Sequence, residues 1–160
     1  MISSLGYLRI ESANVTAWRE FGLKILGMTE GRGPEADAVY LRMDEFPARL
    51  VIIPGSAERL LASGWEVADT HALAAVGRAL ADAGVGSKPA SDAELAARRV
   101  GAMLTVEDPA GHTLEVFCGA ALDSRPSVSP YGTRFVTGDL GLGHVVLPVP
   151  AGCPDRKSVV

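Results

Sequence analysis

One histidine, His144, stands out among the side chains of this sequence that could hold a metal ion. It lies in the segment GDLGLGHVVLPV, residues 138–149, where a glycine-rich turn runs into an apolar stretch. This pattern predicts a β-strand, and a neutral imidazole near the start of a strand is a suitable metal ligand. A single histidine does not define a metal site, so any partner ligands have to come from elsewhere.

For the other polar side chains that could carry chemistry, a structural role is the simpler interpretation. Glu115 is on a predicted strand that faces the concave side of the fold, and we expect a solvated glutamate or one at the rim, because no histidine faces it. His71, in the first turn of a predicted helix, and His112, at a hairpin tip, are expected at the surface. The pair Arg98 and Arg99 is expected to lie on a solvated face.

Length and composition fit one folded domain, with room for an additional fragment. The 160 residues are 48% hydrophobic and 21% charged, and the net charge of −4 offers no basic surface for nucleic acid or an anionic membrane. No apolar stretch approaches the roughly 20 residues that cross a bilayer, and the N-terminus lacks a signal-peptide pattern. Cys118 and Cys153 form neither a disulfide framework nor a metal-binding pair, which favours a reduced, cytoplasmic protein.

The order of predicted elements in the first half is one strand, one helix and three short strands. Alternating apolar positions predict the strand at 4–12, and helical spacing after Asn14 predicts a helix at about 15–26 that ends at Gly27. The β-rich segments that follow lie at 28–33, 38–43 and 48–55.

The second half repeats this order. We predict a strand at 63–69, a helix that begins after Asp69 and ends at Gly84, and a short strand at 86–89. A helical turn at 93–99 and a hairpin of 101–107 with 112–119 complete the second half.

Two copies of a βαβββ module account for this repetition. Gly6-Tyr7 and Gly64-Trp65 open the first strand of each copy, 58 residues apart, and each last strand ends in glycine. Neither copy can bury both faces of its strands alone, so we predict an α+β fold in which paired βαβββ modules form an eight-stranded curved mixed sheet with helices outside.

The predicted domain organisation is a paired-module domain at 1–119, a linker at 120–139 and the first strand of a further domain at 140–160. The linker is rich in proline, arginine and hydroxyl residues. Leu142-Gly143-His144 resembles Leu5-Gly6-Tyr7, so His144 stands where Tyr7 and Trp65 stand in the complete modules. Because aromatics at those positions would fill the concavity, the domain at 1–119 is predicted to be structural rather than catalytic.

The segments SLGYLRIE, AWREFGLKILGM, DPAGHTLEVFCG and SPYGTRFVTGDLGLGHVVLPV resemble type I extradiol catechol dioxygenases of the vicinal oxygen chelate superfamily. The resemblance covers about 150 residues, from Ser4 to Val149. It is closest to the actinobacterial enzymes that cleave a steroid catechol (3,4-DHSA), followed by the 2,3-dihydroxybiphenyl 1,2-dioxygenases. The GLGHVV segment is specific for this group, whereas the repeated modules are shared by the whole superfamily.

The resemblance implies an N-terminal domain without metal and a C-terminal domain that binds Fe(II) through two histidines and one glutamate. The first histidine falls on His144, and the remaining ligands and the acid–base residues lie beyond this chain. Glu115 belongs to the inactive domain and receives no metal role. A catechol and O₂ are the implied substrates, a homo-oligomer is the implied assembly, and no residue of this chain is implied to be catalytic.

The sequence departs from the family at about residue 151, where AGCPDRKSVV replaces the expected continuation. We interpret this tail as an artefactual end and expect the chain alone to be inactive and to hold no iron stably. The alternative is a metal-free binding or assembly module of the same superfamily. A glyoxalase-like isomerase is disfavoured because Tyr7 and Trp65 stand where metal ligands would be needed.

Overall fold

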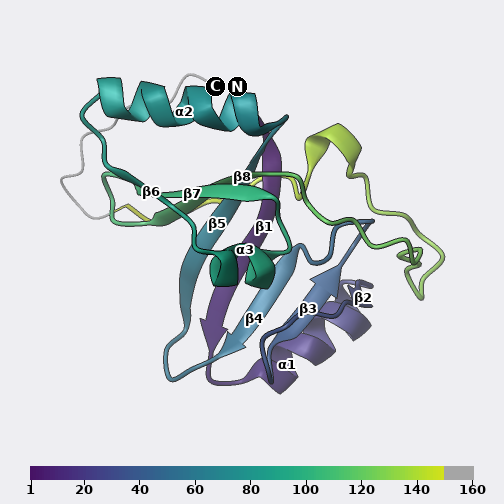
Figure 1. Ribbon diagram of the computed structural model, residues 1–160. Helices are drawn as coiled ribbons and strands as arrows, with labels where there is room; N and C mark the ends of the chain where they lie inside the picture. The colour runs from purple at the N-terminus through teal and green to yellow at the C-terminus, as the bar shows by residue number, and fades with distance from the viewer. Residues whose placement is uncertain (150–160) are drawn as a thin grey trace.

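The computed structural model describes residues 1–149, which form two consecutive βαβββ modules (Figure 1). The first module consists of β1 (Ile2–Ser12), α1 (Val15–Glu20), the π-helical turn η1 (Phe21–Ile25), β2 (Thr29–Glu30), β3 (Val39–Arg42) and β4 (Leu50–Pro54). The second consists of β5 (Arg59–Val67), α2 (Thr70–Asp82), β6 (Ser87–Pro89), α3 (Asp92–Arg98), β7 (Ala102–Glu107) and β8 (Thr113–Cys118). The predicted order of elements is confirmed.

The eight strands form one mixed sheet in the order β2-β3-β4-β1-β5-β8-β7-β6. The two modules meet where β1 and β5 pair antiparallel, and within each module the first and last strands pair parallel, β1 with β4 and β5 with β8. The order is therefore symmetric about the β1–β5 contact, as expected for two copies of one module. The predicted fold class is confirmed.

Both faces of the sheet are covered. On one face, α1 packs over Leu41 and Ile52, and α2 packs over Val67 and Val116. Figure 1 shows α1 and α2 at separate ends of the sheet. The opposite, concave face carries Tyr7, Tyr40, Val51, Met103 and Phe117, and α3 lies beside it through Leu95.

Side-chain caps fix where the helices begin. Asn14 accepts a hydrogen bond from the Ala17 amide, and Asp69 accepts one from the Ala72 amide. At α3, Ser91 and Glu94 form a reciprocal capping box. The helix predicted at 15–26 has the expected extent, but its second half, η1, is π-helical. Gly27, at φ 71°, ends it as predicted.

Residues 119–142, which we call the strap, are fastened to the domain along their length. The buried Arg42 donates to the Arg125 carbonyl and lies 3.6 Å from the Asp123 carboxylate. Thr29 and Ser127 share a hydrogen bond of 2.8 Å, and Phe135 packs against the α1 side of the core. Figure 1 shows the strap leaving β8, passing the β2 side of the sheet and returning towards β1.

Residues 144–149 form no strand, contrary to the prediction of a strand in 140–149. The short 3₁₀ turn η2 (Gly138–Leu140) is followed by irregular chain. A strand requires a free edge to pair with, and β1, the nearest strand, is already paired on both sides by β4 and β5. One backbone hydrogen bond, from the Leu142 amide to the Leu5 carbonyl, joins the chain just before these residues to β1.

The assignment of 140–160 to a second domain stays a prediction, and the interpretation of the tail, including Cys153, lies outside the described residues. Among the helices of residues 1–149, none is long and apolar enough to cross a membrane.

Candidate functional site on the concave face

Three positions on neighbouring strands form a row across the concave face: Tyr7 on β1, Gly64 on β5 and Glu115 on β8. Gly64 is the register partner of both Tyr7 and Glu115. The Tyr7 ring fills the space in front of Gly64, because a Cβ built on Gly64 would overlap that ring. The missing side chain at residue 64 therefore leaves the space that the phenol occupies.

Glu115 is buried in a network of polar contacts, not solvated as the sequence led us to expect. Its side chain is 3% exposed. It accepts a hydrogen bond of 2.6 Å from the Tyr7 hydroxyl and another of 2.6 Å from Nη2 of Arg98. Burial raises the pKa of Tyr7 well above its usual range, and Glu115 raises it further, so the phenol remains a donor at neutral pH.

Arg98 is not a solvated cation either, contrary to the expectation that Arg98 and Arg99 lie on a solvated face. Its guanidinium binds Glu115 through Nε and Nη2, and its side chain is 15% exposed. Burial alone would lower the pKa of Arg98, but the hydrogen bonds and charge of Glu115 raise it, so the guanidinium stays charged. The negative charge of Glu115 is therefore already compensated without a metal ion.

Two further ion pairs lie on this side of the sheet. The buried Arg9 binds the Glu35 carboxylate with both Nη atoms, at 2.7 and 3.1 Å. The buried Arg49 pairs with Asp44, donates to the Gly6 carbonyl and stacks 3.7 Å above the Phe46 ring. Within residues 1–149, no buried side-chain nitrogen or oxygen lacks a hydrogen-bond partner.

Trp65 lies on the opposite face from Tyr7, which corrects its placement in the concavity. Because Gly64 faces the Tyr7 ring, the alternation of side chains along β5 turns Trp65 to the helix-covered face. Its indole Nε1 donates to Ser63 at 3.0 Å, two residues away on that same face. The 58-residue offset aligns Gly6-Tyr7 with Gly64-Trp65 in the sequence, but the side chains of Tyr7 and Trp65 point to opposite faces of the sheet.

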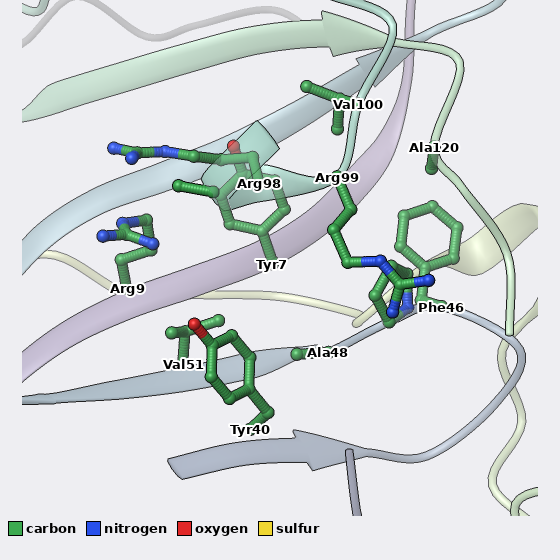
Figure 2. A pocket seen from close by; sticks show the side chains of 12 residues that line it. Tyr7, Arg9, Tyr40, Phe46, Ala48, Val51, Arg98, Arg99, Val100 and Ala120 are labelled. Carbon is green, nitrogen blue, oxygen red and sulfur yellow. The ribbon is translucent and has the colours of Figure 1, made fainter. Parts of the chain in front are cut away.

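Between α3 and the sheet lies a narrow groove (Figure 2). Its buried floor includes Tyr7, Tyr40 and Val51, and its partly exposed mouth includes Phe46 and Arg99. In Figure 2 the Arg9 and Arg98 guanidiniums lie at one side of the groove, and Arg99 lies at the other beside Phe46. Sequence reasoning missed this groove, although the placement of Tyr7 and Arg9 at alternate positions of one strand was a signal that both share its face.

The three histidines lie apart from this network. His71 is exposed as expected. His112 is only partly exposed, because its Nδ1 lies 3.0 Å from the Asp108 carboxylate within the hairpin turn. His144 is exposed on irregular chain after η2.

The described residues do not fit an iron site. Across residues 1–149, no three His, Cys, Asp or Glu side chains come close enough together to hold a metal ion. His144 stands alone, and the Glu115 carboxylate is already occupied by Tyr7 and Arg98. An open Fe(II) site requires two histidines and a carboxylate that converge on one point.

Known proteins share this architecture. A solved catechol 2,3-dioxygenase superposes with a TM-score of 0.83 at 36% identity, over 88% of this chain and 50% of that one. A halotolerant catechol dioxygenase superposes with a TM-score of 0.85 at 33% identity, over 94% of this chain and 51% of that one. The paired modules are thus the vicinal oxygen chelate fold in the form found in extradiol dioxygenases.

Sequence comparison agrees. The family model described as dihydroxybiphenyl dioxygenase BphC D1 matches residues 5–55. An iron-dependent extradiol dioxygenase of Rhodococcus jostii (strain RHA1) is 58% identical over 146 residues, 91% of this chain and 49% of the relative. A biphenyl-2,3-diol 1,2-dioxygenase of Sphingomonas paucimobilis is 36% identical over 150 residues, 91% of this chain and 50% of the relative.

The chain is an N-terminal domain of the BphC-type extradiol dioxygenases. It spans about half the length of the relatives it matches.

Proposed function

We propose that residues 1–119 of this chain are the metal-free first domain of an Fe(II)-dependent extradiol dioxygenase, which opens a catechol ring beside a hydroxyl group and incorporates both atoms of O₂, and that its iron-binding domain begins at about residue 140. The 58% identity with the iron-dependent extradiol dioxygenase of Rhodococcus jostii carries the proposal. The substrate we propose is a catechol formed from a steroid ring, with 2,3-dihydroxybiphenyl-like catechols as the next class. We further propose a cytoplasmic enzyme that assembles as a homo-oligomer.

His144 is the one candidate iron ligand we assign to this chain, and two further ligands have to come from residues outside 1–149. Its exposure supports this role, because an exposed side chain can turn towards ligands elsewhere. The strap supports it too, since the bond from Leu142 to Leu5 fixes the chain two residues before His144. Glu115 has no such freedom.

The test is to express the natural gene with its own reading frame continued past codon 150 and to compare two variants. His144→Ala is expected to lose stoichiometric iron and ring cleavage, measured by metal analysis and by absorbance of the ring-fission product. His71→Ala changes another exposed histidine, on α2; it is the matched control and is expected to retain both iron and activity. Retention of iron and activity by His144→Ala would overturn the assignment.

A metal-free binding module is the second candidate, and the groove on the concave face favours it. A stop codon directly after codon 150 in the natural gene would support the module. A continuing frame that encodes a second histidine and a strand-borne glutamate would support the dioxygenase.

A further inference from the structure

The groove on the concave face brings cations and aromatic rings together around a small hollow. The hollow in this groove has a volume of about 20 Å³, which is room for about one water molecule. A methyl group is of similar size. The floor around this hollow, Tyr7, Tyr40 and Val51, is buried and mostly apolar, whereas Arg99 lies at the partly exposed mouth (Figure 2).

The charges that line the groove do not balance. Glu35 neutralises Arg9, and Glu115 neutralises Arg98. The side chain of Arg99 makes one polar contact within residues 1–149, a long hydrogen bond of 3.5 Å from Nη1 to the Arg32 carbonyl, and no carboxylate of these residues pairs with it. The groove therefore has one guanidinium whose charge and remaining donors are available to a ligand.

The backbone holds this arginine in an unfavourable conformation. Arg99 ends α3 at φ 56° and ψ 48°, the left-handed region that glycine normally occupies at this position. Its amide bonds to the carbonyls of Leu95 and Ala96, and its own carbonyl accepts from Ala121 of the strap. Strained non-glycine residues concentrate at binding sites, and here the strained residue is the arginine at the mouth of an apolar hollow.

We propose that this groove binds a short-chain carboxylate of the size of acetate. The two carboxylate oxygens meet the planar guanidinium of Arg99, which matches them in geometry. The alkyl group enters the hollow between Tyr7, Tyr40 and Val51. A benzoate ring is too large for a hollow that holds about one water molecule.

The experiment is a titration of the ¹⁵N-labelled chain with sodium acetate, followed by amide chemical shifts at constant ionic strength set with sodium chloride. Acetate is expected to bind with millimolar affinity and to shift the amides of Ala48, Val51 and Val100. Acetamide, the neutral molecule of the same shape, and benzoate are expected to cause no saturable shifts. Identical shifts with acetamide or with chloride alone would overturn the proposal.

The variant Arg99→Asn removes the guanidinium while keeping a residue that tolerates the left-handed conformation. It is expected to weaken acetate binding about tenfold, the loss typical of a charge-assisted hydrogen bond. Arg32→Gln is the matched control: Arg32 is exposed and meets Arg99 only through its backbone carbonyl. Its amide spectrum and its acetate affinity are expected to be unchanged. Unaltered affinity in a folded Arg99→Asn variant would contradict the proposal.

Discussion

The hydroxyl of Tyr7 on β1 donates a 2.6 Å hydrogen bond to the carboxylate of Glu115 on β8, 108 residues away in the sequence. With Gly64 between them, the two residues form the row that crosses the junction of the modules. Arg98 supplies the positive charge beside Glu115. This domain thus stabilises its buried carboxylate with a phenol and a guanidinium, and that arrangement leaves no vacancy for a metal ion at Glu115.

Removal of the Glu115 carboxylate is expected to destabilise the domain strongly. Glu115→Ala leaves Arg98 and the Tyr7 hydroxyl without their partner, and loss of one member of a buried ion pair costs about 3–5 kcal/mol. Glu115→Gln keeps an acceptor for Tyr7 and should cost less. Urea unfolding followed by circular dichroism measures both values. Equal stability of the wild type and Glu115→Ala would show that the network contributes nothing.

Gly64 is expected to tolerate no larger side chain. The Cβ of Gly64→Ala would overlap the Tyr7 ring, and overpacking of a buried contact costs about 1–3 kcal/mol. Gly86→Ala is the matched control, because nothing lies within 4 Å of a Cβ at that position. Thermal unfolding of the two variants should separate them, with only Gly64→Ala lowering Tm.

Acid is expected to weaken the Arg9–Glu35 contact. Burial alone would raise the pKa of Glu35, but the hydrogen bonds and charge of Arg9 lower it below the ordinary value of 4.5. A carboxyl with a lowered folded-state pKa contributes stability above its unfolded pKa and loses that contribution as pH falls through the folded pKa. Glu35→Gln should therefore show a shallower decrease in unfolding free energy below about pH 5. Urea titrations at several pH values check this, and parallel curves for the two proteins would contradict it.

Arg42 is expected to hold the strap in place. It donates to the carbonyls of Asp44, Phe46 and Arg125, and its charge lies beside Asp123. Arg42→Met would leave these groups unpaired and should cost about 3 kcal/mol. It should also speed amide hydrogen exchange in residues 121–129 more than in β1. Arg134→Met is the control, since Arg134 is an exposed residue of the same strap.

The element order and the pairing of modules could be predicted from the sequence because both depend on local signals. Apolar alternation, the caps Asn14 and Asp69 and the terminating Gly27 act within a few residues, and each is found where the pattern places it. Glu115 and Arg98 were wrongly predicted to be solvated. Their partners come from other elements, and a sequence pattern does not say which charges a fold brings into contact.

The predictions that Trp65 faces the concavity and that residues 144–149 belong to a strand are wrong for related reasons. A β-bulge between Leu5 and Tyr7 shifts the register against β5, so matching dipeptides in the two modules need not face the same way. The segment after residue 143 has the composition of a strand, but strand formation depends on a partner edge rather than on composition alone. The described residues leave no such edge beside β1.

The most direct test of the metal-free assignment is an anaerobic Fe(II) titration of the 160-residue chain, followed by addition of 2,3-dihydroxybiphenyl and air. We predict no saturable iron binding at a 1:1 ratio and no yellow ring-fission product above the rate of free Fe(II) with the same catechol. Stoichiometric iron and sustained turnover by this chain alone would contradict the proposal that its paired modules form a metal-free domain.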